Sequence, residues 1–169
     1  MDIVITHGAR TPIGKMGASL SKVSTTELGK LIIDEVANNR ANIDMAEIDH
    51  VILGQVKQAA MPSNIARYAA LEAGLSETTP AYTVHRQCGS GLQAIMDAYL
   101  MITCGEADVV LAGGVENMSQ STYFMRNTKN GLGSTGNYVI EDSLIAGGPG
   151  AIPAKKYGNI PMRLTAENV

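Results

Sequence analysis

The chain has 169 residues, of which 45% are hydrophobic and 17% are charged, and its formal net charge is −3. This length fits one ordinary domain, and the apolar share excludes a disordered acidic or basic tail. The charge balance gives no basic footprint for nucleic acid, and one Phe, six Tyr and no Trp argue against stacking platforms for single strands. We therefore expect no nucleic-acid partner.

The N-terminal sequence MDIVIT lacks a basic region followed by a long apolar stretch, so it does not predict a signal peptide. No window approaches the roughly 18 uninterrupted apolar residues of a membrane-spanning helix. Two cysteines do not make a disulfide scaffold, and without a paired histidine they are too few for a zinc site. We expect a reducing, cytoplasmic setting, no membrane contact and no metal.

Apolar runs and helical repeats alternate along the first two thirds of the chain. Short apolar runs predict buried strands at 2–6, 51–54, 81–84 and 108–112. Between them, apolar residues at helical spacing predict helices over 25–39, from 65 to a glycine cap at Gly74, and over 92–104. Strands that alternate with helices predict an α/β fold with a mostly parallel sheet covered on both faces.

Local sequence signals add detail to the predictions for two of these helices and for the segment that follows the last strand. Ser24 and Glu27 have the spacing of a capping box at the start of the first helix. The helix at 92–104 is apolar nearly all round, which predicts burial on most of its sides. Residues 118–160 are rich in Gly, Ser, Asn and Pro with little periodicity, so we expect a lid or binding loop there.

Cys88 is the candidate nucleophile because it leaves a predicted strand and precedes a predicted helix. A thiol at a helix N-terminus lies near free N–H groups and the positive end of the helix dipole, and both favour the thiolate. Gly89 and Gly91 permit a tight turn and close approach of a ligand. The same N–H groups suit the oxyanion that forms when a thiolate attacks a carbonyl. The alternative is a small, inert cysteine in a buried turn.

Neither the second cysteine nor the histidines supply an obvious partner for Cys88. Cys104 follows 16 residues later on the same predicted helix, about 24 Å along its axis, so the two cannot form a disulfide and Cys104 is expected in the core. His85 precedes Cys88 by three residues, an offset that directs it to the opposite face of a strand. His7 and His50 are expected to be structural or solvated. The chain thus presents a nucleophile without an evident base.

The turn Gly113–Glu116 follows a predicted strand, as phosphate-binding loops do. It matches neither the dinucleotide-binding pattern G-x-G-x-x-G nor the P-loop pattern. Nucleotide-dependent chemistry is therefore not the favoured reading, and no cofactor is expected.

Five runs in this order resemble the thiolase family, which comprises acetyl-CoA acetyltransferases and 3-ketoacyl-CoA thiolases. They are Ala9–Lys15 (ARTPIGK), Asn64–Arg67 (NIAR), Cys88–Ala94 (CGSGLQA), Ala107–Ser119 (ADVVLAGGVENMS) and Thr165–Val169 (TAENV). The resemblance implies a thiolase-like mixed, mostly parallel sheet. It also implies that coenzyme A thioesters are substrates, that the protein is a homo-oligomer, and that Cys88 takes the acyl group as a thioester.

In the family a histidine activates this cysteine and a second cysteine moves a proton on the other substrate. Both lie in C-terminal motifs, Gly-His-Pro and Cys-x-Gly-Gly, that this chain does not contain. The resemblance therefore implies an N-terminal portion of a thiolase, with residues 1–118 as an incomplete domain core and 119–169 as the start of the loop region. The rival hypotheses are a non-catalytic truncated fragment and a related decarboxylating condensing enzyme.

The resemblance also assigns positions near the substrate, with two departures. Met162 matches a methionine that borders the acyl pocket. Pro161 stands where the family commonly has a histidine near the coenzyme A tail, and His85 stands where it usually has an asparagine. The nearest cationic cluster for coenzyme A phosphates is formed by Lys155, Lys156 and Arg163, with solvated surface as the alternative reading.

Overall fold

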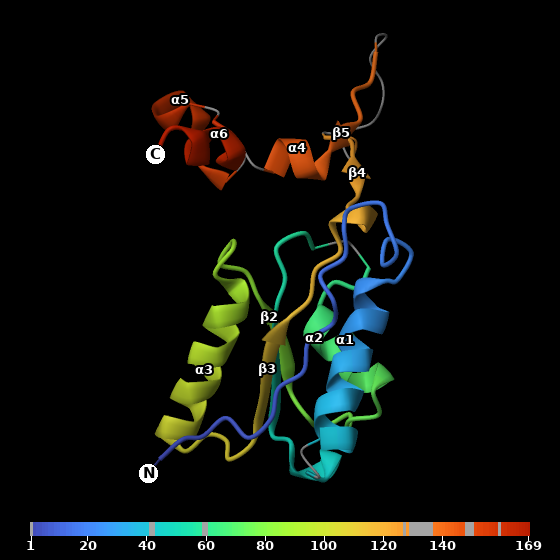
Figure 1. The fold of residues 1–169 in the computed structure, drawn as a ribbon, viewed down its shortest axis with the longest axis vertical. Helices are drawn as coiled ribbons and strands as arrows, with labels where there is room; N and C mark the ends of the chain where they lie inside the picture. The colour runs from blue at the N-terminus through green and yellow to red at the C-terminus, as the bar shows by residue number, and fades with distance from the viewer. Residues whose placement is uncertain are drawn as a thin grey trace. The chain divides into compact units, whose positions relative to one another are not determined.

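The computed structural model describes residues 2–40, 43–58, 61–126, 128, 137–147, 151–158 and 160–169. The chain forms two compact units, Met1–Gln120 and Ser121–Val169. The first contains the sheet and the long helices, as the ribbon in Figure 1 shows. The side chains of residues 39, 40, 147 and 163 lie outside the described part, which includes that of Arg163 from the predicted cationic cluster.

The first unit is built on three parallel strands in the order β2-β1-β3: Ala81–Val84, His50–Gly54 and Val110–Gly114. The central strand β1 pairs in register with both neighbours, from Val51 opposite Ala81 and from His50 opposite Val110. Its residues 51–54 are buried. A run of apolar residues without alternation fits this position, because a central parallel strand is covered on both faces.

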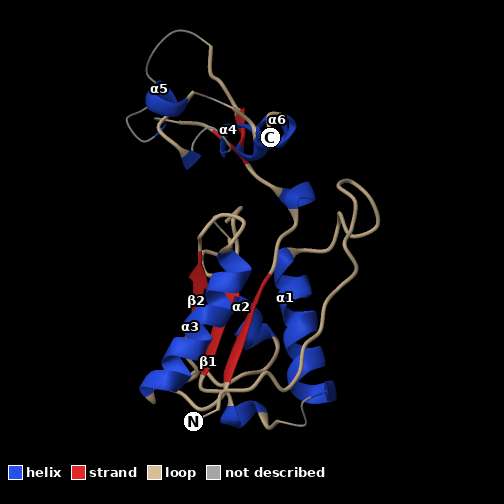
Figure 2. Cartoon of the chain, turned by 60° about the vertical axis from the view of Figure 1, so that its left-hand side comes forward, coloured by secondary structure: helices blue, strands red, loops and turns tan. Residues whose placement is uncertain are grey.

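Helices cover both faces of this sheet, which confirms the predicted α/β class (Figure 2). Helices α1 (Thr25–Asp34) and α2 (Ile65–Glu72) pack on one face, where Ile33, Val51 and Ile65 share a buried cluster. Helix α3 (Ser90–Cys104) packs on the other face, with Ala94 and Ala98 against Ile52. Small alanines at i and i+4 let α3 lie close to the strands.

The predicted capping box of α1 is confirmed. The Ser24 hydroxyl accepts from the Glu27 amide at 3.1 Å, and the Glu27 carboxylate accepts from the Ser24 amide at 2.8 Å. The Ser24 hydroxyl also donates to the Glu27 carboxylate at 2.7 Å, and this bond, together with the one from the Ser24 amide, holds the pKa of Glu27 below its ordinary value. The helix was expected to reach residue 39, and it continues beyond Asp34 as a π-helical segment, Glu35–Arg40.

Two predictions about the first unit are wrong. Residues 2–6 pair with no strand within the described part of the chain, and Val4 and Ile5 are 72% and 83% exposed. Helix α3 is not buried on most sides, since Leu92 and Tyr99 are 64% and 55% exposed. Its composition is apolar all round, but only one of its faces has the sheet to pack on.

The second unit contains short elements where an aperiodic loop was expected. Strands β4 (Tyr123–Phe124) and β5 (Glu141–Asp142) form an antiparallel pair, and the helices are α4 (Ser143–Gly147), α5 (Ala154–Tyr157) and α6 (Met162–Glu167). The Arg126 guanidinium lies 2.7 Å from the Glu141 carboxylate and above the Phe124 ring.

Candidate functional site

Cys88 lies in the connection between β2 and α3, after the carboxyl end of a parallel strand. Ligands of open α/β sheets bind at this edge. Helix α3 begins at Ser90 with Gly89 as its N-cap, so Cys88 directly precedes the cap. Its side chain is exposed rather than packed in a core turn. The structure thus leaves the thiol open to solvent, directly before the N-terminus of α3.

Two successive tight turns carry the thiol. The Gly89 amide donates to the Arg86 carbonyl at 3.1 Å, and the Ser90 amide donates to the Gln87 carbonyl at 3.0 Å. Gln87 has φ +48°, and it alone among the described non-glycine residues has positive φ. A turn with positive φ only at its first central residue normally has glycine there. A left-handed Gln costs about 1–2 kcal/mol, so the backbone next to the candidate nucleophile is strained.

Three glycines form the corner beneath this turn. A Cβ on Gly54 would lie 2.5 Å from the Ser90 carbonyl carbon and 2.7 Å from the Gly91 nitrogen. A Cβ on Gly114 would lie 3.1 Å from the Gly54 oxygen and 3.5 Å from the Gly91 Cα. The ends of β1 and β3 therefore touch the first turn of α3 backbone to backbone. This close approach fixes where the Cys88 turn stands above the sheet.

A chain of polar side chains runs from the turn along α3 to β2. The Arg86 guanidinium donates to the Gln93 side-chain carbonyl, and the Gln93 amide donates to Asp97 at 2.6 Å. The Tyr82 hydroxyl donates to the other Asp97 oxygen at 3.2 Å. Burial raises the pKa of Tyr82, and the charge and hydrogen bond of Asp97 raise it further.

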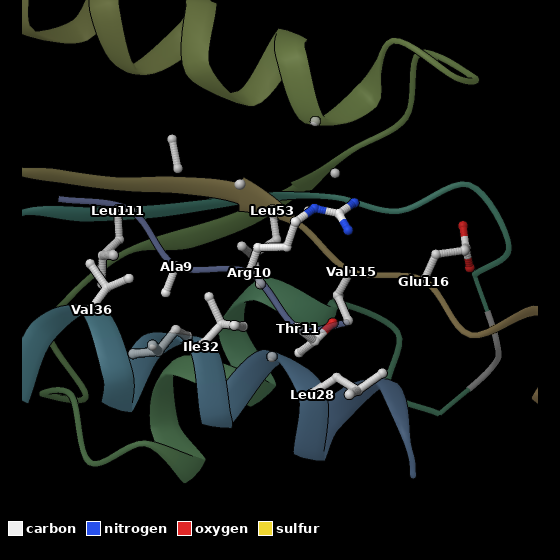
Figure 3. Close-up of a pocket in the computed structure, with 18 of the residues that line it drawn as sticks. Ala9, Arg10, Thr11, Leu28, Ile32, Val36, Leu53, Leu111, Val115 and Glu116 are labelled. Carbon is white, nitrogen blue, oxygen red and sulfur yellow. The ribbon is translucent and has the colours of Figure 1, made fainter. Parts of the chain in front are cut away.

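A cavity of about 1060 Å³ opens beside the turn, and Cys88, Ser90 and Gly91 are among its lining residues. Figure 3 shows one wall of it, where Leu28 and Ile32 of α1 and Val36 of the π-helical segment extend toward the sheet and the N-terminal segment. The N-terminal residues 3–16 line another wall. The space next to the candidate nucleophile is therefore bordered largely by apolar side chains, as ligand pockets usually are.

No base for Cys88 emerges from the described residues. His85 is exposed, and no hydrogen bond between described residues joins it to the thiol. His50 begins β1, with a buried Nδ1 that has no partner. Cys104 was expected in the core and is exposed at the C-terminal end of α3, because that face of the helix is uncovered. Both cysteines are free thiols.

Met162 belongs to the second unit and is the first residue of α6, with 73% of its side chain exposed. Lys155 and Lys156 are exposed on α5, and the Lys156 ammonium lies 5.0 Å from the centroid of the Tyr157 ring. Within the described residues, no group of three or more His, Cys, Asp or Glu is arranged to hold a metal ion. No described helix is long and apolar enough to cross a bilayer.

The sequence patterns did not reveal that the residues after β3 hold neighbouring loops in place through hydrogen bonds. The Glu116 carboxylate accepts from the amides of Val56 and Lys57 at 2.9 and 3.0 Å, which ties the end of β3 to the loop after β1. The Asn117 amide donates to the carbonyls of Leu20 and Val23 at 3.0 and 2.7 Å. The Glu and Asn that follow this glycine turn therefore order the neighbouring loops.

The run Asn64–Arg67 is structural in the same way. Asn64 caps α2 by accepting from the Arg67 amide at 3.1 Å, and it donates to the Ala81 carbonyl at 3.0 Å. The Arg67 guanidinium donates to the carbonyls of Thr79 and Glu77, both at 2.7 Å. This motif therefore anchors α2 to the start of β2, the strand that leads to Cys88.

Comparisons with known proteins agree with this fold. The family described as "Thiolase, N-terminal domain" matches residues 3–169. The chain is 41% identical over 167 residues to a "Probable acetyl-CoA acyltransferase" of Staphylococcus epidermidis, and the match covers 99% of this chain and 41% of that protein. A relative of the same description from Staphylococcus aureus is 40% identical, with the same coverage.

A solved structure shows the same arrangement. The crystal structure of the Bacillus anthracis acetyl-CoA acetyltransferase matches with a TM-score of 0.79 and 41% identity, over 85% of this chain and 36% of that one. The chain thus spans about 41% of the length of the curated relatives it matches. Because the family match extends over nearly every residue, the chain belongs to the thiolase family.

Proposed function

We propose that this chain carries the nucleophile of an acyl transfer between coenzyme A and an acyl-CoA. The observation that supports it is the exposed Cys88 thiol, directly before the N-cap of α3 and beside an apolar cavity. The relatives named as acetyl-CoA acyltransferases support the same substrate class. The parent reaction condenses two acyl-CoA units or, in reverse, cleaves a 3-ketoacyl-CoA.

The proposed step uses one thiol and one thioester. The Cys88 thiolate attacks the acyl carbonyl, so that an Sγ–C bond forms and the C–S bond to coenzyme A breaks. Coenzyme A leaves as a thiolate and takes up the proton that Cys88 lost. The positive end of the α3 dipole suits the oxyanion formed on the way. Met162 would border the acyl group, as the family resemblance implies.

The test compares the two free thiols of the chain after incubation with acetyl-CoA. Peptide mass mapping is expected to show the acetyl group on Cys88 sooner than on Cys104, because Cys104 lies at the C-terminal end of the helix dipole. The Cys104→Ser variant should keep the label and Cys88→Ser should lose the fast phase. Equal rates at both thiols, or label confined to Cys104, would overturn the assignment.

We further infer that the 169-residue chain does not complete turnover by itself. Within the described residues no histidine is hydrogen-bonded to Cys88, and a nucleophilic thiol needs a base or charge partner for repeated cycles. Incubation with a 3-ketoacyl-CoA and coenzyme A is expected to give at most one acyl group per chain. Thiolysis over many cycles by the purified chain would contradict this.

A further inference from the structure

The strained residue before Cys88 must be held by its surroundings. Positive φ at a non-glycine residue persists only where neighbouring contacts over-determine it. One side chain bonds both to the amide of the preceding residue, Arg86, and to the carbonyl of Gln87 itself. The Ser90 hydroxyl accepts from the Arg86 amide at 2.9 Å and donates to the Gln87 carbonyl at 2.6 Å. It therefore clamps the strained segment from one point.

Ser90 is suited to this task because it cannot move away. Only 4% of the residue is exposed, so water does not compete for its hydrogen bonds. Its carbonyl carbon lies against Gly54, where there is no room even for a Cβ. The hydroxyl is thus carried on a helix turn that is fixed to the sheet, while Cys88 stands exposed at the tip of the clamped segment.

We propose that Ser90 is a positioning residue, which holds the Gln87–Cys88 turn so that the thiol stays at the N-terminus of α3. This inference rests on the nucleophilic role of Cys88 proposed above. Without the hydroxyl, Gln87 relaxes to negative φ, and the Cys88 side chain is no longer held in its exposed position directly before the N-cap of α3. Ser90 itself touches no reacting atom.

The experiment measures alkylation of both thiols by iodoacetamide in the intact chain at neutral pH. Cys104 is the internal reference, since it lies at the far end of the same helix. In Ser90→Ala, the rate of Cys88 alkylation is expected to fall about fivefold relative to the rate of Cys104 alkylation. The net free energy of about one hydrogen bond changes an equilibrium by this factor. If Ser90→Ala keeps its circular dichroism spectrum and the ratio of the Cys88 to the Cys104 alkylation rate does not change, the proposal is overturned.

Two further variants separate positioning from a general loss of stability. Ser90→Thr keeps a hydroxyl on the Cβ atom of residue 90. It is expected to bring the ratio of the Cys88 to the Cys104 alkylation rate most of the way back to that of the natural chain. Thr103→Ala removes a hydroxyl that donates to the Tyr99 carbonyl at the other end of α3, and it should leave Cys88 alkylation unchanged. If the Thr variant is as slow as Ser90→Ala despite a native spectrum, the hydroxyl is not the cause and the proposal fails.

The most direct test removes the strain itself. Gln87→Gly accepts positive φ without cost, so a clamp is less needed in that background. Ser90→Ala is expected to slow Cys88 much less in Gln87→Gly than in the natural chain. The same loss in both backgrounds would overturn the proposal. The double variant also keeps the test informative if Ser90→Ala alone unfolds. Because alkylation needs no acyl-CoA, these results are independent of whether Cys88 accepts an acyl group.

Discussion

At the scale of single residues, Asn117 holds the loops before α1 and after β3 together through three side-chain hydrogen bonds. Besides its two bonds to the carbonyls of Leu20 and Val23, its side-chain oxygen accepts from the Ser119 amide at 3.0 Å. Asn117→Ala is expected to lower the free energy of unfolding by about 1–3 kcal/mol, because it leaves partly buried backbone groups unpaired. Urea unfolding measures this loss.

Gln120→Ala is the matched control for that variant. It removes one exposed bond, from the Gln120 side chain to the Ser21 carbonyl. The expected change is less than about 0.5 kcal/mol, as for most exposed positions. Equal effects of the two substitutions would mean that Asn117 does not order this loop.

Asp49 gives a prediction about pH. Hydrogen bonds from the amides of Val109 and then Asp108 hold its pKa below the ordinary value. A carboxylate with a depressed pKa in the folded state contributes stability above its unfolded pKa, about 3.9, and loses it as the pH falls through the folded value. The stability difference between the natural chain and Asp49→Asn should therefore be constant above about pH 5 and shrink below about pH 4.

Chemical denaturation at a series of pH values measures that difference. Because both chains share all other carboxylates, their titration cancels in the comparison. A difference that grows on acidification would show that Asp49 is not held as an anion by the two amides.

Individual residues also show what the sequence could predict. The place of Cys88 between a strand and a helix was predictable, since an apolar run precedes it and a helical repeat follows it. Its role as a nucleophile stays a prediction. Ser90 and Gln87 were not singled out, because a hydroxyl that closes a turn and a residue with positive φ leave no periodic pattern. Cys104 was misplaced for a related reason: an apolar neighbourhood in sequence does not say which face of a helix is covered.

At the scale of elements, the contact between β1 and α3 depends on the absence of a side chain. Gly54→Ala is expected to destabilise the chain by about 1–3 kcal/mol, as overpacking does, because its Cβ would meet rigid backbone of α3. Thermal unfolding followed by circular dichroism measures this effect.

Gly91→Ala is the control, since a Cβ at this position meets nothing within 4 Å. It replaces a glycine within α3, so it should raise stability by about 0.5–1 kcal/mol. If Gly54→Ala were as well tolerated as Gly91→Ala, the backbone contact at this corner would not be as close as the structure indicates.

The elements themselves were largely predictable. The strands at 51–54 and 81–84 and the start of α1 appear where apolar runs and the capping box indicate. Residues 2–6 carry the same apolar signal as β1, yet they pair with no strand among the residues that the structure describes. A run of apolar residues reports a tendency to be covered, but strand pairing also needs a neighbour, which local sequence does not specify.

At the scale of the whole molecule, the first unit has an unpaired sheet edge. The Val109 carbonyl accepts from the Asp49 amide just before β1, and the Val115 amide donates to the Gly54 carbonyl of β1. The alternate backbone groups of Val110, Ala112 and Gly114 therefore point to the other side of β3. No strand pairs with that side within the described residues. An unpaired edge of this kind is a template for association.

The exposed face of α3 also favours association between copies of the chain. Leu92, Met96 and Leu100 are 64%, 46% and 54% exposed at successive helical turns, which forms an apolar stripe. We expect the chain to self-associate with rising concentration in sedimentation velocity, and Leu92→Glu with Met96→Lys to weaken this. Leu31→Glu is the control, because Leu31 on α1 is exposed to a similar extent but lies outside this stripe. A monodisperse monomer that unfolds cooperatively would contradict the prediction.

The glycine corner beneath Cys88 has a consequence for how substrate preference varies among acyltransferases built this way. Gly54, Gly91 and Gly114 meet through main-chain atoms, so this floor has no side chain whose size could be changed in small steps. Under the acyl transfer proposed above, this floor would be the same for every acyl group. Selection for longer or shorter chains would then act on walls of the cavity that carry exchangeable side chains, such as those of α1 and the N-terminal segment.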